Sequence, residues 1–370
     1  MKLLAPCVRG TAPRARGMTA GAALATLAVI AIAPSAHATF SIAAYDSATQ
    51  ELGVAVQSRA FSVGMAVPWA EAGVGAIATQ ASTNESFGPL GLSMLRAGKS
   101  APDVLRALLD GDSGSAHRQL GIVDARGLSA NFTGKLCSEW AGGVTGPGYA
   151  IQGNILASEA VVRGMEKAFL ETRGELAERL LAALVAAQAA GGDRRGMESA
   201  SLLVVRPSEE FPEYRTRYVD LRVEDHKDPI NELIRVYRIL EGQRLAEAHL
   251  RFAAAYEKSG KLDLARSERE RVGESLARSL GRKDADASTL NGLAWICATN
   301  DVHLAEALEA AERAVAMEPK NAEILDTLAE VHYRNGNAAK AIEVETQALS
   351  LSPNDQYLKD QIARFKGGKK

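Results

Sequence analysis

The chain has 370 residues, of which 46% are hydrophobic, and its formal net charge is −2. This length and hydrophobic content are sufficient for one large core and a second domain. A nearly neutral chain without a basic block argues against nucleic acid as the main partner.

Residues 1–38 have the pattern of a secretory signal peptide. Basic residues such as Lys2 precede an apolar run over 19–33, and no acidic residue occurs before Asp46. The run is shorter than the roughly 20 residues that a spanning helix needs, so the pattern favours a cleaved signal over a stable membrane span. The small-x-small segment 36–38 then predicts cleavage after Ala38 and a periplasmic or secreted protein.

Cleavage after Ala38 would make Thr39 the first residue of the mature protein. An N-terminal threonine carries a hydroxyl nucleophile and a free α-amine, whose pKa of about 7.7–8.0 lets it accept the hydroxyl proton near neutral pH. The alternative is that an exported protein must start with some residue, and that threonine stands there by chance.

The segment 39–238 predicts an α+β domain of strands, then helices, then strands. Two expected strands, 40–44 and 52–56, are joined by a polar turn, and a third run covers 73–78. Their residues are small or apolar on both faces, which favours two sheets packed face to face. Further elements are expected as a helix over 100–111, strands over 119–123, 128–133 and 149–152, helices that start at Ser158 and near Leu176, and strands over 201–205 and 218–223.

The segment 239–370 is predicted to be all helix and to contain repeats. Pro319 and Pro353 lie 34 residues apart, as do Ala307 and Ala341, and this is the period of the tetratricopeptide (TPR) repeat. Such stacked helical hairpins can bind a peptide, mediate self-association or cap a neighbouring domain. The sequence leaves these three roles open.

Several separate segments share a common pattern. They begin at Thr39, Glu51 and Val67, and they continue at 119–124, 152–154 and 192–196. Together these segments resemble the DUF1028 family over residues 39–238. That family resembles the N-terminal-nucleophile (Ntn) hydrolases, so the resemblance implies an αββα four-layer sandwich and, as an activity, amide hydrolysis.

The resemblance assigns the nucleophile to Thr39. Gln57 stands where proteasome subunits have an aspartate, and no lysine occurs between Thr39 and Lys99. Arg59 is the sole cation between Thr39 and Arg96, so it is predicted to stabilise the deprotonated nucleophile.

Three polar residues near predicted strand ends, Thr79, Asn84 and Asn154, are candidates to bind the oxyanion or the substrate. The alternative for each is a hydrogen bond within a turn or cap. Asp193 is a further candidate: it is expected to pair with Arg194 or Arg195, either to order the chain before the next strand or to bind a substrate carboxylate.

Two functions are therefore open. The first is an exported amidohydrolase that acts on a small amide or peptide-like substrate through Thr39. The second is a non-catalytic binding module whose TPR repeats recruit a protein partner; a homo-oligomer is possible in either case. The scattered histidines predict no metal site and no cofactor, and Cys137 and Cys297 are expected as isolated thiols, with pairing as the alternative.

Overall fold

A computed structural model describes residues 39–207 and 216–367 of the chain. The predicted signal segment, 1–38, lies outside the described residues. Thr39 is the first described residue and also the first residue of the first strand.

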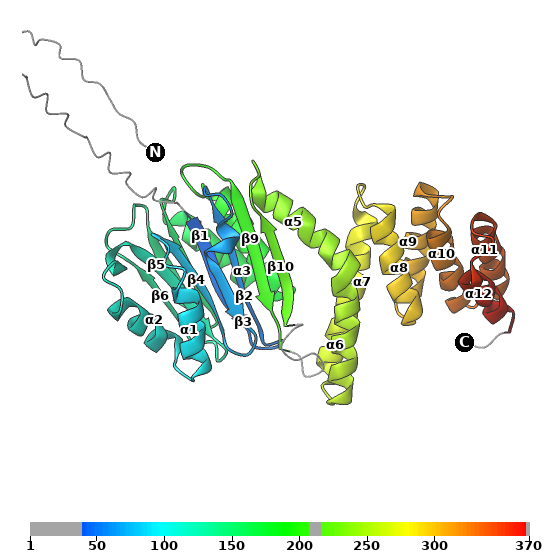
Figure 1. Cartoon of the computed structure of the whole chain (residues 1–370), viewed down its shortest axis with the longest axis horizontal. Helices are drawn as coiled ribbons and strands as arrows, with labels where there is room; N and C mark the ends of the chain where they lie inside the picture. The colour runs from blue at the N-terminus through cyan, green and yellow to red at the C-terminus, as the bar shows by residue number, and fades with distance from the viewer. Residues whose placement is uncertain (1–38, 208–215, 368–370) are drawn as a thin grey trace, which may run out of the picture. The chain divides into compact units, whose positions relative to one another are not determined.

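The first part of the chain forms two antiparallel sheets (Figure 1). Sheet A has the strand order β10-β9-β2-β1-β8-β7, and sheet B has the order β3-β4-β5-β6. The strands of sheet A are β1 (Thr39–Asp46), β2 (Glu51–Ser58), β7 (Gly142–Gly146), β8 (Tyr149–Asn154), β9 (Ser199–Val205) and β10 (Arg217–Val223). Those of sheet B are β3 (Pro68–Glu71), β4 (Gly75–Ala81), β5 (Arg118–Asp124) and β6 (Ser129–Thr133).

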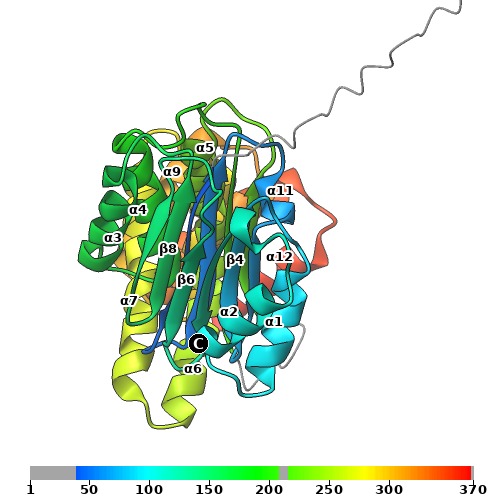
Figure 2. The ribbon, with the colours of Figure 1, turned by 90° about the vertical axis from the view of Figure 1, so that its left-hand side faces the viewer.

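Helices cover the outer face of each sheet, so the predicted αββα sandwich is confirmed (Figure 2). Sheet B is covered by α1 (Phe87–Arg96) and α2 (Ala101–Asp110), and sheet A by α3 (Ala160–Glu171) and α4 (Leu176–Ala189). Short 3-10 turns, η1 (Val63–Met65) and η2 (Ser115–His117), join the elements.

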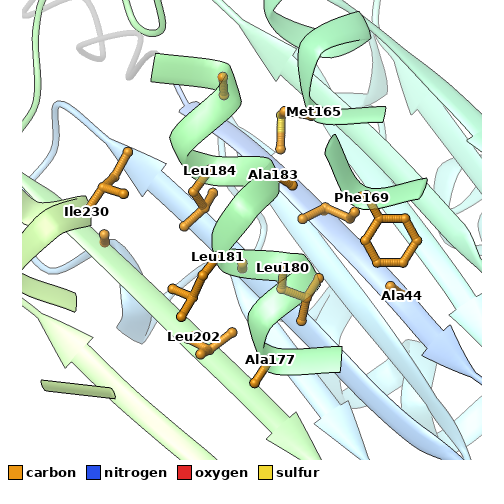
Figure 3. Close-up of a cluster of buried hydrophobic side chains, with 14 of the residues drawn as sticks. Ala44, Met165, Phe169, Ala177, Leu180, Leu181, Ala183, Leu184, Leu202 and Ile230 are labelled. Atoms are coloured by element: carbon orange, nitrogen blue, oxygen red, sulfur yellow. The ribbon is translucent and has the colours of Figure 1, made fainter. Parts of the chain in front are cut away.

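The largest core lies between sheet A and its helices. Leu180 and Leu184 of α4 and Phe169 of α3 pack on the strands, where they meet residues such as Ala44 and Leu202 (Figure 3). Burial of one such side chain is worth about 1.5–3 kcal/mol. This core fixes sheet A, and with it the position at which β1 begins.

The two faces of β1 have different surroundings. Phe40 and Ile42 point to the helix-covered face and belong to the core described above. Ala43, on the other face, belongs to a second cluster between the sheets. Because successive side chains of a strand alternate, Thr39 and Ser41 share the face of Ala43 and point into the space between the two sheets.

Four elements were not predicted from the sequence: α1, β3, β7 and the helix α5 (Pro229–Leu240), most of which lies before the predicted boundary at residue 238. Helix α1 contains Gly88 and Gly91, which disfavour a helix, yet a Cβ on Gly88 would lie 2.1 Å from a ring atom of Trp69. Close packing on sheet B therefore overrides local propensity in α1. Strand β7 is rich in glycine and pairs only with β8, at the edge of sheet A.

The rest of the described chain is helical. It contains α5 (Pro229–Leu240), the π-helical turn η3 (Glu241–Leu245), α6 (Ala246–Lys258), α7 (Leu262–Gly281), α8 (Ala287–Thr299), α9 (Leu304–Met317), α10 (Ala322–Arg334), α11 (Ala338–Leu351) and α12 (Gln356–Gly367). Residues 229–258 form one uninterrupted helical run, and Tyr237 within it belongs to the core of sheet A. The predicted domain boundary at residue 238 falls inside this run.

The helices from α6 onward pack as consecutive antiparallel hairpins (Figure 1). The repeated alanines Ala307, Ala314, Ala341 and Ala348 are all fully buried. Small residues at these positions let neighbouring helices approach closely. The C-terminal part is thus a TPR-like helical array, as its 34-residue period predicted.

Candidate functional site

Thr39 lies at one end of the space between the two sheets. Its partner in β2 is Ser58, and its partner in β8 is Asn154. Only 2% of Thr39 is exposed. The first residue of β1 is thus enclosed by polar neighbours from both adjacent strands.

The hydroxyl groups of Thr39 and Ser58 are in direct contact. Their Oγ atoms lie 3.0 Å apart, and either can donate the hydrogen bond. The carbonyl of Ser58 accepts from the backbone of Glu198, on the side of β9. Thr39 and Ser58 therefore form a non-hydrogen-bonded pair, the kind in which opposing side chains come closest.

Five buried side chains next to Thr39 form what we call the amide network: Ser41, Gln80, Gln119, Gln152 and Asn154. Gln80 of β4 accepts from Ser41 Oγ at 2.6 Å and donates to Gln119 Oε1 at 2.7 Å. Asn154 Nδ2 donates to the same Gln119 oxygen at 2.9 Å, and Gln152 Nε2 donates to Ser41 Oγ at 2.7 Å. Side chains from both sheets are thereby joined.

The amide network also holds the backbone of Thr39. Gln80 Nε2 donates to the carbonyl oxygen of Thr39 at 3.2 Å. Gln119 Nε2 donates to Gly153 O at 2.7 Å and to Thr133 Oγ1 at 2.9 Å, which ties β5 to β8 and β6. A network whose members are almost fully bonded has one preferred arrangement, so the position of Thr39 is rigidly defined.

The model of DUF1028, a family of unknown function, matches residues 39–233. The chain belongs to the DUF1028 family. The crystal structure of SPO2555 from Silicibacter pomeroyi, another DUF1028 protein, is 34% identical and has a TM-score of 0.50. The match covers 55% of this chain and 86% of that one. A search of curated proteins returns no match to the chain.

Solved TPR structures match the C-terminal helices. The second TPR domain of human RPAP3, solved with an HSP70 peptide, is 16% identical with a TM-score of 0.24, and the match covers 35% of this chain and 99% of that one. The Arabidopsis OM64 TPR domain is 15% identical with a TM-score of 0.23, over 34% and 98% of the two chains.

Of the three oxyanion or substrate candidates in the DUF1028 domain, one is the direct neighbour of Thr39. Asn154 pairs with Thr39 across β1 and β8 and is 2% exposed. Thr79 is buried in β4, and its hydroxyl donates to the carbonyl of Asn84 at 3.2 Å. Asn84 lies in the following loop, where its side chain accepts from Ser86 N and Oγ.

The two charged candidates lie where β2 ends. Arg59 follows Ser58 directly, and its guanidinium, with 46% of the side chain exposed, is ion-paired with Glu198. Asp193 is fully buried and ion-paired with Arg195 at 3.0 Å. Asp193 Oδ2 also accepts from the backbone N–H of Arg59 at 3.0 Å, so the structure brings Asp193 and Arg59 together. The catalytic role of Arg59 stays a prediction.

Gln57, the residue at the proteasome aspartate position, faces away from Thr39. Its register partner is Phe40, whose side chain points to the helix-covered face. An acid at position 57 would therefore not reach Thr39 in this DUF1028 domain, whereas Ser58 does.

Five residues around Thr39 were not predicted from the sequence as site residues: Ser41, Ser58, Gln80, Gln119 and Gln152. A signal was present, because each is a polar residue within the buried stretch of its strand. Such interruptions of a buried strand require a polar partner. Only the sheet register shows that the partners are one another.

Other features of the described residues are quickly stated. No group of three or more His, Cys, Asp or Glu side chains within 39–207 and 216–367 is arranged to hold a metal ion. Over the same residues, no helix has the length and apolar character needed to cross a membrane. Cys137 and Cys297 are free thiols, and burial raises the pKa of Cys297 to about 12.

Proposed function

We propose that this DUF1028 protein is an exported amidohydrolase that uses Thr39 as an N-terminal nucleophile. The observation that carries the proposal is the position of Thr39: it begins β1, faces the space between the sheets and contacts Ser58 at 3.0 Å. In a chain that starts at this residue, hydroxyl and α-amine would stand at the same buried end of the sandwich.

The reaction would be acyl transfer. The Thr39 hydroxyl attacks the amide carbonyl while the neutral α-amine takes its proton, and the amine then passes this proton to the leaving nitrogen. Water cleaves the resulting ester and regenerates the threonine. Ser58 would orient the hydroxyl, and the amide network would hold the Thr39 carbonyl in place.

The tetrahedral intermediate needs hydrogen-bond donors directed at its oxyanion. Asn154 suits this role better than Thr79 or Asn84, because it is the direct strand partner of Thr39. Arg59 supplies a positive charge near the same end, partly balanced by Glu198. A small amide or peptide-like compound is the substrate class proposed.

The test begins with the N-terminus of the protein exported by a bacterial host. Intact mass and N-terminal sequencing should give a chain that starts at Thr39. This mature chain should form a covalent adduct with a threonine-directed β-lactone probe, and peptide mapping should place the adduct on Thr39. Thr39→Ala should lose the adduct and any amidase activity, at least about 10³-fold.

A matched control keeps the hydroxyl but moves the amine. A chain that retains Ala38 carries its free amine one residue away from Thr39, and it should not react. Equal adduct formation by the Ala38-started chain, or an exported protein that starts elsewhere, would contradict the proposal.

The second candidate is a non-catalytic binding module. It is favoured by the burial of Thr39, which leaves only 2% of the residue exposed, and by the helical array that follows the sandwich. Blocking the mature α-amine by acetylation would then leave partner binding intact, whereas the hydrolase loses its activity.

A further inference from the structure

The loop 191–196 bonds to the segments that follow both strand partners of Thr39, Asn154 in β8 and Ser58 in β2. Its backbone pairs with the chain that follows β8: Asp193 forms an antiparallel bridge with Leu156, and Arg194 N donates to Ile155 O at 3.2 Å. On its opposite edge, the segment after β8 is bonded to the chain that precedes β7, where Leu156 N donates to Trp140 O at 3.0 Å. The loop therefore lies on the side of β8 that β1 occupies.

The same loop contacts the chain that follows β2. Successive backbone N–H groups of a strand point to opposite neighbours. The Ser58 carbonyl points to the side of β9, where Glu198 N donates to it, so the N–H of Arg59 points to the side of β1. Asp193 Oδ2 accepts this N–H at 3.0 Å.

These contacts bring the Asp193 carboxylate to the end of sheet A at which β1 begins. Leu156, the bridge partner of Asp193, follows Asn154, the strand partner of Thr39, by two residues, and the chain bends between them at Ile155, whose φ is 54°. The Asp193 carboxylate accepts the backbone N–H of Arg59. Arg59 follows Ser58, the strand partner of Thr39, and therefore lies opposite the position that precedes Thr39.

The loop is built to hold this carboxylate. Gly191, Gly192 and Gly196 have φ values of 109°, 52° and 107°, a region that favours glycine. Asp193 Oδ1 accepts from the backbone of Arg195 at 2.8 Å, and Oδ2 accepts from the Arg195 guanidinium at 3.0 Å. With its side chain fully buried, Asp193 is a fixed negative charge whose only side-chain counter-ion among the described residues is Arg195.

We propose that Asp193 is a positioning residue that binds the α-ammonium group of Thr39 in the mature protein. This inference rests on the proposed function. The carboxylate holds the amine at the end of β1, and Arg195 balances part of its charge. The Arg195 guanidinium thereby limits the rise that the Asp193 carboxylate causes in the pKa of the amine.

Two of the arginines near this end are paired with other carboxylates, and a third is exposed. On the β2 side, Arg59 is paired with Glu198. On sheet B, Arg118 is paired with Asp112 at 2.7 Å, and on the loop itself Arg194 is exposed. The polar groups that face Thr39 from β4, β5 and β8 belong to the neutral amide network. Asp193 is thus the carboxylate best placed to affect the amine.

The test measures the pKa of the Thr39 α-amine directly. The mature chain is released from an N-terminal fusion by a protease that leaves Thr39 first, and the amine is labelled in trace amounts with isotopic acetic anhydride at a series of pH values. Mass spectrometry of the N-terminal peptide gives the labelling rate, and its pH dependence gives the pKa. Circular dichroism confirms that each variant is folded.

Asp193→Asn should lower the pKa of the amine by about one unit, because a nearby carboxylate favours the charged form. Arg195→Gln should raise the pKa of the amine, because Asp193 then acts without its counter-ion. This variant retains the Asp193 carboxylate and its bonds to the backbone, so it tests the inference even if Asp193→Asn fails to fold. Asp112→Asn removes a similar arginine-paired carboxylate at the same end and should leave the pKa unchanged.

The inference is overturned if Asp193→Asn and Asp112→Asn give the same value, or if Asp193→Asn and Arg195→Gln shift the pKa in the same direction. No substrate is needed for this measurement. If the mature protein has no amidase activity but the variants shift the pKa of the amine as expected, only the hydrolase proposal is contradicted. If the protein is active but the variants leave this pKa unchanged, only the role of Asp193 is contradicted.

Discussion

Two of the places where the protein buries polar side chains are built from opposite chemistry. Between the sheets, the amide network combines donors with acceptors in neutral groups. In the last helical repeat, Asp326, Glu330 and Glu345 form a carboxyl cluster whose ionised members can only accept. Neutral amides stay bonded at every pH, whereas the carboxyl cluster depends on a proton.

The carboxyl cluster is only partly neutralised. Glu330 is ion-paired with Arg334 at 2.7 Å and with Arg364. Glu345 is fully buried, and neither of its oxygens, nor Asp326 Oδ1, has a donor among the described residues. One shared proton lets Glu345 and Asp326 hydrogen-bond to each other. Burial, reinforced by Asp326, raises the pKa of Glu345 from its ordinary value of 4.5 to about 8.

The comparison separates a polar cluster that fixes geometry from one that responds to pH. A rigid, neutral network suits a position where one side chain must be held in place. The carboxyl cluster instead makes the stability of the C-terminal repeats depend on protonation. Each of the following changes tests one side of this contrast.

The largest effect is expected for Gln119→Leu. It removes the group that joins Gln80, Asn154 and Thr133, and buried groups left without partners cost about 1–3 kcal/mol each. The free energy of unfolding should fall by about 3 kcal/mol in urea titrations, and probe labelling at Thr39 should slow. Ile122→Val on the same strand, at about 1 kcal/mol, should leave labelling unchanged. Equal labelling rates in both variants would show that the network does not position Thr39.

The next effect is a pH dependence of the helical repeats. Between pH 5 and 8 the folded state keeps a proton on Glu345 that the unfolded state has lost, so the free energy of unfolding falls as pH rises, by up to about 3 kcal/mol. Glu345→Gln should flatten this dependence in urea titrations followed by circular dichroism. Glu343→Gln, on the exposed face of α11 and paired with Lys340, is the control. Parallel pH curves for wild type and Glu345→Gln would refute the role of the cluster.

The smallest effect is expected for Ser58→Ala, which removes the hydroxyl next to Thr39. One hydrogen bond to a reacting hydroxyl is worth about 1 kcal/mol, so labelling of mature Thr39 should slow about fivefold to tenfold. Ser201→Ala is the matched control, because Ser201 is a buried serine on the same face of sheet A whose hydroxyl has no hydrogen-bond partner among the described residues. A similar slowing in both would mean that the contact with Ser58 is not specific.

Much of the fold follows from the sequence because its signals are local. Strict alternation predicted β10, and Ser100 with Asp103 predicted the start of α2, where Ser100 Oγ accepts from Asp103 N at 3.3 Å. Helix α1 was missed because packing of Trp69 and Ile77 on its glycines outweighs their poor helix propensity. Local signals fail where tertiary contacts decide the conformation.

The candidate site was predictable only in part. Thr39 was marked by its place after a signal-like segment, and Asn154 by its polar character near a strand end. Ser58 and Gln119 were not found, because their role depends on strand register, and a register shift of one residue would turn each side chain to the opposite face. Gln57 is adjacent to Ser58 in sequence, yet its side chain lies on the opposite face of the sheet, away from Thr39.

By itself, the sequence determined the α+β class and the helical repeats, and it placed the start of the first strand within one residue of Thr39. These follow from periodicity and from residue chemistry along the chain. Only the tertiary structure decided what surrounds Thr39. The loop around Asp193 bonds to the segments that follow β2 and β8, the two neighbours of β1 in the sheet, although the loop lies more than 150 residues after Thr39 in the chain. Contacts between such distant segments are set by sheet pairing and core packing, which no local pattern encodes.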